Sequence, residues 1–334
     1  MLRALAVWAV PTAIIVGVYI AADPFGVVRL REERAEGGFM PNKAVATTNN
    51  FRIFQPEKQF DSFIIGPSLS VYYPIADWKR HLPADARPYH FDFSAMTIRQ
   101  MSEAVDYLAA NSKLRNALFI TEPYALAFDN EEDTPFRTPP VMTESAWKRL
   151  ATQYAFFSHW YALSNLNGFI SEKLLGYSES KGKNTYPIDP SITHYIPEIN
   201  EESNPHREAE LDRLAREFEA ENHDWKSRKA PVEARAMPTF ISGTANEDYL
   251  RHMASTLKAA QTDYYFVVGA NKRNLRLSAA DKKIMKDIFG ERYIDLTDDM
   301  EYILCNPYLF YDDIHYRPVV AREVMDRIYS EPDR

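Results

Sequence analysis

Metal- and phosphate-binding patterns are missing from this sequence, and cysteine is nearly so. The single cysteine, Cys305, excludes an internal disulfide. The eight histidines are scattered, and no Cys/His cluster has zinc-ligand spacing. No glycine-rich phosphate loop is present, so we expect neither a metal nor a nucleotide cofactor. Cys305 is most simply a small core residue, although its position shortly before Asp312 leaves a role beside a site open.

Positive charge is also in short supply. The chain has 39 Lys and Arg against 47 Asp and Glu, a net charge of −8. Nucleic-acid-binding proteins usually present a basic face, and no basic stretch interleaved with aromatic residues occurs here, so we expect no nucleic-acid partner. Hydrophobic residues make up 46% of the 334 residues, which excludes wholesale disorder and suits one large domain or a domain with an insertion.

The N-terminus contains an uncharged apolar run of 19 residues, from position 4 to position 22. As a helix, it just reaches across a hydrocarbon layer of ~30 Å. It exceeds the ~7–15 residues of a signal-peptide core, so residues 1–22 are predicted to be an uncleaved transmembrane anchor, with a cleaved signal as the alternative. Basic residues lie on both sides, so charge does not fix the orientation. Residues 23–56 have little pattern and are interpreted as a juxtamembrane connection.

An alternation of short apolar stretches and helical patterns follows, over residues 57–330. The predicted strands are Phe60–Ile65, Pro88–Phe93, Asn116–Thr121, Asp263–Val268 and Arg292–Leu296. The predicted helices begin at Thr97 (a capping box with Gln100), Asn246, Ser278 and Pro318, and they end near Ala110, Ala260, Gly290 and Tyr329. This alternation predicts a three-layer α/β/α domain with a mostly parallel five-stranded sheet.

A long interruption at about residues 123–245 separates the third predicted strand from the fourth. It contains an aromatic-rich helical pattern near 143–160 and a charged helix from Asn204-Pro205 to about Glu221. Charged helices usually present a solvated face, and aromatic stretches are usually core, with a substrate or partner surface as the alternative. We therefore expect a largely helical insertion.

Two short segments contain the candidate chemistry. Gly66-Pro67-Ser68 follows the first predicted strand, and Asp312-Asp313-Ile314-His315 follows the last. In parallel sheets, ligands bind at the carboxyl ends of the strands. A serine hydroxyl needs a base to accept its proton and a carboxylate to orient that base. Each segment alone has an ordinary explanation, as a common turn and as a surface histidine, but together they supply all three groups.

The order of these segments resembles the SGNH/GDSL hydrolase superfamily, over about residues 58–122 and 246–330. The phrases DSFIIGPSLS and FYDDIHYRP are similar to those of its membrane-anchored bacterial members. The resemblance implies that Ser68 is the nucleophile, His315 the general base and Asp312, rather than Asp313, the orienting carboxylate. It also implies an oxyanion hole, for which the N–H groups of Ser68, Leu69 and Met96 are the candidates.

The chain departs from the superfamily pattern at two places. No glycine follows the second predicted strand, where the N–H of Ala95 or Met96 has to substitute. No asparagine follows the third, where Thr121-Glu122-Pro123 stands instead. Losing one oxyanion donor typically costs about 10²–10³ in rate. Asn271, after the fourth strand, either supplies a donor or is an ordinary turn residue.

The resemblance implies an extracytoplasmic serine esterase or O-acyltransferase that acts on a cell-envelope polysaccharide or polymer. It places the chain in the cytoplasmic membrane, with the main domain on the periplasmic or extracellular side. Anchored relatives resemble proteins of D-alanyl transfer and alginate O-acetylation, which implies a multi-pass membrane-bound O-acyltransferase as partner. The alternative is a non-catalytic accessory protein that binds polysaccharide or that membrane partner, because a fold does not fix a reaction.

Overall fold

The computed structural model describes residues 2–22, 39–40, 43–127, 145, 147, 151, 186–187 and 194–330 of the chain. The strands of the central sheet are β2 (Ser62–Gly66), β3 (Pro88–Asp92), β4 (Asn116–Thr121), β9 (Asp263–Val268) and β11 (Tyr293–Asp295). Short strands form three further pairs, β1 (Phe39–Met40) with β5 (Tyr186–Pro187), β6 (His194–Ile196) with β7 (Glu201–Ser203), and β8 (Arg235–Ala236) with β10 (Leu275–Arg276).

The helices alternate with these strands. The α-helices are α1 (Leu2–Ala22), α2 (Lys43–Lys58), α3 (Ile75–Trp78), α4 (Ile98–Asn111), α5 (Pro123–Leu126), α8 (Pro205–Glu221), α9 (Ala245–Ala259), α10 (Ala279–Phe289), α11 (Leu296–Asp299) and α12 (Pro318–Ser330). The 3-10 helices are η1 (Ser68–Tyr72), η2 (Lys79–His81), η4 (Trp225–Ser227), η5 (Gly290–Arg292), η6 (Glu301–Cys305) and η7 (Pro307–Leu309).

The central sheet has the order β11-β9-β4-β2-β3, and every neighbouring pair in it is parallel. The prediction of an α/β protein with a parallel five-stranded sheet is therefore confirmed. The chain moves outward from β2 to β3 and then crosses to β4 on the other side of β2. In doubly wound sheets, the crevice at such a reversal is where ligands bind. Here the reversal lies at the carboxyl ends of β2 and β4.

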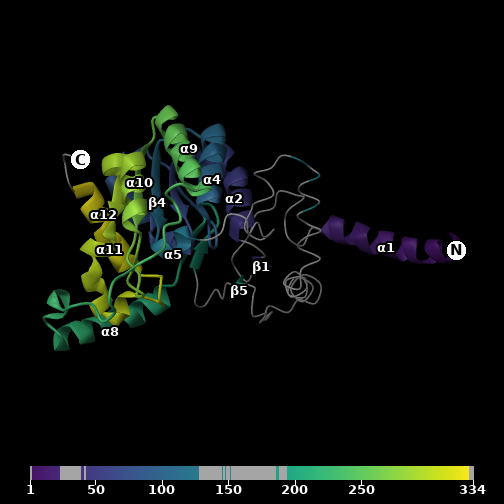
Figure 1. Cartoon of the computed structure of the whole chain (residues 1–334). Helices are drawn as coiled ribbons and strands as arrows, with labels where there is room; N and C mark the ends of the chain where they lie inside the picture. Colours follow the sequence, from purple (N-terminus) through teal and green to yellow (C-terminus); the bar gives the residue numbers. More distant parts are fainter. Residues whose placement is uncertain are drawn as a thin grey trace.

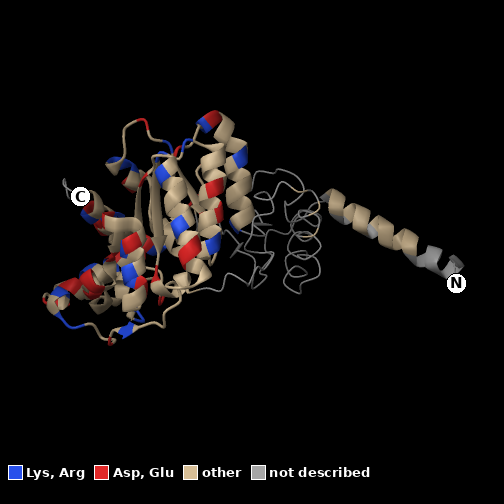
Figure 2. Ribbon diagram, turned by 45° about the horizontal axis from the view of Figure 1, so that its top comes forward, with Lys and Arg blue, Asp and Glu red and all other residues tan. Residues whose placement is uncertain are grey.

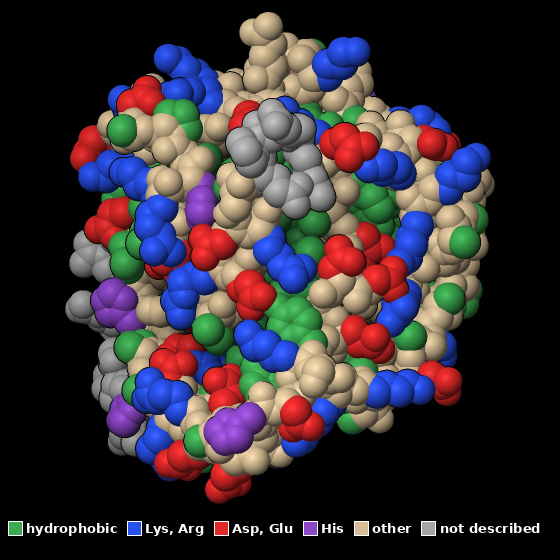
Figure 3. Space-filling model, turned by 90° about the vertical axis from the view of Figure 1, so that its left-hand side faces the viewer, with side chains coloured by type: hydrophobic (Ala, Val, Ile, Leu, Met, Phe, Trp, Pro, Cys, Tyr) green, Lys and Arg blue, Asp and Glu red, His purple; other side chains and the backbone are tan. Residues whose placement is uncertain are grey.

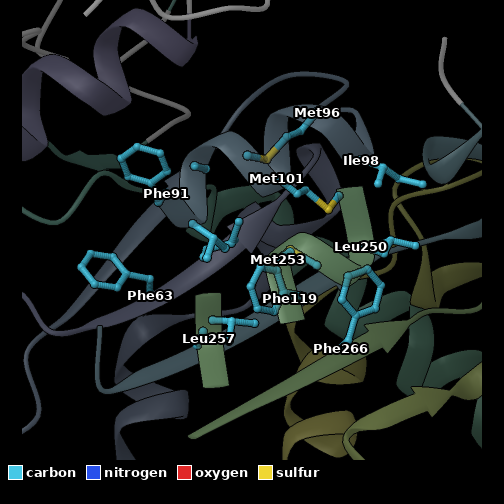
Figure 4. Close-up of a cluster of buried hydrophobic side chains, with 14 of the residues drawn as sticks. Phe63, Phe91, Met96, Ile98, Met101, Phe119, Leu250, Met253, Leu257 and Phe266 are labelled. Carbon is cyan, nitrogen blue, oxygen red and sulfur yellow. The ribbon is translucent and has the colours of Figure 1, made fainter. Parts of the chain in front are cut away.

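One face of the sheet is buried by α2, α4, α9 and α10 (Figure 1). Side chains of alternate strand positions form this core, because successive residues of a strand point to opposite faces. Figure 4 shows Phe63, Phe91, Phe119 and Phe266 there, with methionines and leucines of the helices between them. The ring centroids of Phe119 and Phe266 are 5.6 Å apart.

The other face is covered by η1, α3, α11, η6 and α12. The alternate strand residues Ile64, Leu118 and Val267 form its core, together with the fully buried Trp78 of α3. Helices therefore cover both faces, as the alternating pattern predicts.

The predicted helix ends agree with the observed ones to within a few residues. The hydroxyl oxygen of Thr97 accepts the N–H of Gln100, and the N–H of Thr97 donates to the side-chain oxygen of Gln100. This capping box begins α4 as predicted. The α9 helix is different, because its N-cap is Thr244, not Asn246. The Asn246 side chain donates instead to the Phe240 carbonyl at 2.9 Å, so it connects α9 to the preceding loop.

The α2 helix lies where the sequence indicates only a pattern-poor connection over residues 23–56. Residues 43–51 of α2 are all buried, polar and apolar alike. A helix buried on all sides has no apolar stripe, so its sequence has no helical periodicity to detect. The connection predicted there is wrong for this part, because α2 packs on the central sheet.

The α1 helix coincides with the predicted anchor. Within the described part of the chain, no helix combines the length and apolarity that crossing a membrane requires. The anchor over residues 4–22 therefore stays a prediction.

The predicted insertion is described only in part. The aromatic helix expected near 143–160 lies outside the described residues. The charged helix is confirmed as α8, where Asn204 caps the first turn by accepting the N–H of Arg207. Before it, the β6–β7 hairpin lies against the edge strand β3, and the N–H of His90 donates to the carbonyl of Ile199 in its turn.

Charged residues of both signs are interspersed over the helices (Figure 2). Neighbouring turns pair them, as Arg213 does with Glu217 on α8 and Arg251 with Glu247 on α9. The face seen in Figure 3 has the same mixture of acidic and basic side chains. Such exposed pairs each contribute only about 0.3–0.5 kcal/mol, so the stability of the domain rests on its two apolar layers.

Gly66 provides a test of this packing. A Cβ added there would lie 2.0 Å from the backbone oxygen of Ile120 on β4, which cannot move without displacing the strand. We expect Gly66→Ala to lower the free energy of unfolding by about 3 kcal/mol or more. Urea unfolding followed by the fluorescence of the buried Trp78 and Trp225 measures this. Gly243→Ala is the control, since Gly243 has open space and only a left-handed φ of 73°, which costs about 1–2 kcal/mol. Equal losses in the two variants would contradict the packing argument.

Candidate active site

Ser68 is the first residue of η1, directly beyond the carboxyl end of the central strand β2. Gly66 allows the turn to pass close to the backbone of β4. Ser70 closes the turn, because its N–H and its hydroxyl both donate to the carbonyl of Pro67, at 2.9 and 2.7 Å. Ser68 is therefore held at the sheet edge by short-range bonds, with its side chain partly exposed.

His315 lies in the loop before α12. The N–H of Tyr311 donates to the His315 carbonyl at 2.8 Å, and Phe310 forms a β-bridge with Tyr316, so the loop closes on itself. This loop brings Nε2 of His315 to 2.6 Å from Oγ of Ser68, across 247 residues of sequence. The structure thus joins the two segments that the sequence analysis selected.

Asp312 completes the arrangement. Its Oδ2 lies 2.7 Å from Nδ1 of His315, and its Oδ1 accepts the N–H groups of Ile314 and His315 at 2.9 Å each. A carboxylate at Nδ1 holds the proton on that nitrogen, which leaves Nε2 free to accept from Ser68. Partial burial by itself raises the pKa of Asp312, but the hydrogen bonds from the ring and the two N–H groups outweigh it, so the pKa is lowered.

Asp313 is turned away from the imidazole. Its carboxylate lies 3.4 Å from Nε of Arg273, and its carbonyl accepts the N–H of Lys272 at 2.8 Å. The structure therefore places Asp312, the residue that the resemblance favours, against His315 and gives Asp313 a separate contact.

The candidate oxyanion donors are only partly brought together. Ser68 and Leu69 lie in the first turn of η1, where N–H groups have no partner within the helix. The side chain of Met96 is fully buried in the core (Figure 4), so only its backbone N–H remains for such a role. Ala95, in the loop where the resemblance expects a glycine, has φ 52°, a left-handed backbone that glycine adopts at least cost.

The end of β4 carries a carboxyl group in place of the asparagine. Glu122 is buried and accepts the N–H groups of Tyr124 and Ala125 at 2.8 and 2.6 Å. Burial raises its pKa to about 7 although those two bonds favour the charged form. Asn271 supplies no donor at this edge. Its side chain bonds the N–H and carbonyl of Leu275, as a turn residue does.

The imidazole is in contact with one tyrosine, Tyr72, which packs in turn against a second, Tyr311; the motifs alone indicate neither. The ring of Tyr72 lies 5.4 Å from that of His315 and 4.7 Å from that of Tyr311. Their one sequence signal is closeness to the two motifs, since Tyr72 is four residues beyond Ser68 and Tyr311 directly precedes Asp312. Aromatic contact on one side of the ring limits the orientations open to His315.

Arg317 joins the histidine segment to the insertion. Its side chain is fully buried, and its guanidinium bonds the carboxylates of Glu208 (2.9 Å) and Asp212 on α8. It also donates to the carbonyl of Tyr308 at 3.0 Å. Removing one partner of a buried ion pair is strongly destabilising, so α8 holds in place the loop that carries His315.

A second cluster of buried polar side chains holds the end of β3. Asn200, in the turn between β6 and β7, donates to the carbonyl of His90 and to a carboxylate oxygen of Asp92, at 2.9 and 2.8 Å. Nζ of the buried Lys43 lies 3.6 Å from the other Asp92 oxygen. The hydroxyl of Thr47 donates to the Asp92 carbonyl. The strand end before the Ala95 loop is therefore held from both α2 and the insertion. Polar residues at alternate positions of β3 were the sequence signal for it.

Metal ligands do not gather in the described part of the chain, where no group of three or more His, Cys, Asp or Glu side chains could hold an ion. Cys305 is half-buried, and its thiol donates to the carbonyl of Arg228 at 3.4 Å. Burial raises the pKa of this thiol, so it stays protonated. It packs against the second core, as a small core residue does.

Comparisons with known proteins do not place this chain in a family. No family model matches it, and no curated protein sequence matches it. The geometry of Ser68, His315 and Asp312 is therefore the basis for assigning a function.

Asp312 and Asp313 can be distinguished by experiment. We expect Asp312→Asn to abolish the downfield proton resonance of Nδ1–H in His315, because the amide no longer accepts as a carboxylate does. Asp313→Asn, the matched control, should leave it unchanged. Proton NMR of the wild type and both variants, at a pH where the protein is folded, measures this. Retention of the resonance in Asp312→Asn with loss in Asp313→Asn would reverse the assignment.

The burial of His90 leads us to predict that the free energy of unfolding depends on pH. Both its ring nitrogens are buried without a hydrogen-bond partner, and burial, with Lys43 nearby, lowers its pKa to about 3. The 3.9 Å approach to Glu201 therefore involves a neutral ring. Because the folded pKa lies below the ordinary value of 6.5, its contribution is complete above pH 6.5 and is lost as the pH falls toward 3.

We expect unfolding free energy to fall by about 1.4 kcal/mol per pH unit below pH 6 from this group. His90→Gln should flatten the loss between pH 7 and 5, whereas His206→Gln, at an exposed histidine, should not. Urea unfolding at several pH values measures it. An unchanged slope in His90→Gln would show that His90 is not the group that titrates.

Proposed function

We propose that this chain is a serine-dependent acyl ester hydrolase or O-acyltransferase of the SGNH/GDSL type. The observation that supports it is the continuous line of contacts from Oγ of Ser68 to Nε2 of His315 and from Nδ1 of His315 to Asp312, at 2.6 and 2.7 Å. Both distances are within the range at which a base accepts a proton and a carboxylate orients that base. The position of Ser68 at the reversal of strand order is also where such sheets bind ligands.

The first half-reaction forms an acyl-enzyme. Nε2 of His315 takes the proton of the Ser68 hydroxyl while Oγ attacks the ester carbonyl, and Asp312 stabilises the imidazolium that results. The tetrahedral oxygen takes up negative charge, which the N–H groups of Ser68 and Leu69 at the start of η1 stabilise. The imidazolium then protonates the leaving alkoxide, and the acyl group remains on Ser68.

The second half-reaction releases the acyl group. His315 takes a proton from water or from a sugar hydroxyl, whose oxygen attacks the acyl carbonyl. The bond from the acyl group to Oγ of Ser68 then breaks, and the imidazolium returns the proton to Oγ. Water gives a carboxylic acid, and the sugar hydroxyl gives a new ester. A reduced oxyanion hole lowers the rate with simple esters, since each missing donor costs about 10²–10³. Transfer from a dedicated donor to a bound acceptor is therefore better supported than rapid general hydrolysis, and a cell-envelope polysaccharide or polymer is the acceptor we propose.

The location follows from the same resemblance. In this proposal, residues 4–22 anchor the chain in the cytoplasmic membrane, and the α/β domain works on its periplasmic or extracellular side. The partner is a multi-pass membrane-bound O-acyltransferase that delivers the acyl group. The uncharged run of 19 residues at the N-terminus supports the anchor.

A second function is favoured by the end of β4. Glu122 stands where the superfamily has an amide donor, and Pro123 has no N–H to offer. An ionised carboxylate near an oxyanion would oppose catalysis, although a pKa of about 7 lets Glu122 be partly protonated. The alternative is therefore a non-catalytic accessory protein that binds a polysaccharide or the membrane partner through the same fold.

Reaction with a fluorophosphonate separates the two functions. We expect wild-type protein to be labelled at Ser68, and Ser68→Ala to be unlabelled. His315→Ala should be labelled at least about 10³-fold more slowly, because the serine loses its base. Ser227→Ala and His223→Ala are the controls, since both side chains are exposed and neither lines the cavity next to the site. Labelling rates followed by intact-protein mass spectrometry measure this. A folded wild-type protein that stays unlabelled contradicts the enzymatic proposal and favours the accessory function.

A further inference from the structure

A cavity of about 270 Å³ is lined by Tyr72, whose ring contacts that of His315. Three parts of the chain far apart in sequence form it: η1, the β7 strand with the start of α8, and the loop around Tyr311. Small-molecule sites commonly enclose ~300–1,000 Å³, so this cavity is large enough for one ring-sized group but not for several.

One wall of the cavity is aromatic. Tyr72 and Tyr311 lie with ring centroids 4.7 Å apart, and both line the cavity. The guanidinium of Arg207 stacks on the Tyr311 ring at 4.7 Å and donates to the Tyr311 carbonyl at 3.2 Å. Tyr72 also contacts the His315 ring, so a group bound against this wall is next to the imidazole.

The lining of the cavity also contains acidic residues. Glu201 is held in place by the N–H of Ile75, which donates to its carboxylate at 2.8 Å, and Glu202 follows it on β7. Glu208 also lines the cavity, but its charge is paired with the buried Arg317. Apart from that pair, the lining contains two carboxyl groups and one guanidinium, that of Arg207. Burial raises the pKa of Glu201, so this carboxyl group loses its negative charge first as the pH falls. Glu202 and Arg207 then balance each other, and the cavity does not become basic.

This set of groups matches the chemistry of a sugar. The aromatic faces suit the C–H side of a sugar ring, while carboxylates accept and guanidinium groups donate hydrogen bonds to its hydroxyls. A sugar that carries its own carboxylate is disfavoured, because it would meet two carboxyl groups and only one cation.

We infer that this cavity is the acceptor subsite, which binds one sugar unit without a carboxylate and presents a hydroxyl to His315. The inference rests on the proposed function for the direction of the hydroxyl, but the binding itself needs no serine chemistry. We therefore expect neutral or amino-sugar polymers to be acceptors, and we expect polyuronates not to be acceptors.

Binding is measured with full-length Ser68→Ala protein, which cannot form an acyl-enzyme. The probes are three neutral tetrasaccharides (cellotetraose, mannotetraose and galactotetraose) and one acidic probe, tetramannuronate, titrated by isothermal calorimetry. We expect at least one neutral probe to bind at least about tenfold more tightly than tetramannuronate. In the same background, Glu202→Gln and Arg207→Ala should each weaken that binding at least about fivefold. Glu210→Gln, an exposed position on α8, is the matched control.

The inference is overturned if none of the neutral probes binds, if tetramannuronate binds most tightly, or if both cavity variants bind as the control does. Circular dichroism and thermal unfolding of each variant exclude loss of folding as the cause. Fluorophosphonate labelling without sugar binding would reject the subsite and keep the serine enzyme. Sugar binding without labelling would keep the subsite and reject the enzyme.

Discussion

The parallel pairing of β2 with β3 on one side and β4 on the other is the constraint on which the candidate site depends. Parallel strands bring all their carboxyl ends to one edge, so residues that follow different strands meet there. Ser68 and His315 lie 247 positions apart and are hydrogen-bonded only because of this arrangement. Gly66 makes the pairing compatible with a sharp turn, since any side chain there would meet the carbonyl of Ile120.

Around this edge, buried polar groups fix the direction of the loops, because hydrogen bonds are directional and apolar contacts are not. Arg317 fixes the segment that carries His315, and Asp92 fixes the end of β3 before the Ala95 loop. Both depend on the insertion, through Glu208 in one case and Asn200 in the other. The insertion is therefore part of the framework of the site as well as a wall of the neighbouring cavity.

Features with a regular sequence pattern are predicted well, whereas features that depend on single long-range contacts are predicted poorly. The five strands, the α4 cap at Thr97 and the pairing of Ser68 with His315 follow from periodicity, capping chemistry and motif order. The α2 helix was missed because burial on all sides leaves no periodic pattern. Asn200 is hard to select for a different reason: the partners of its amide N–H groups lie on α2 and β3, 108 to 153 positions away, and the polar residues at alternate positions of β3 are the one local signal. Asn271 had the right residue type and strand position, but its bonds close its own turn.

The full burial of Arg317 has a consequence for how such a protein can diverge. Its charge is compensated by Glu208 and Asp212 on α8, so the arginine and that helix form a single inherited unit. A descendant that kept the helix but lost both carboxylates would keep a buried cation without compensation two residues from His315. In related chains that retain α8, we therefore expect Arg317 and these two acidic residues to change together.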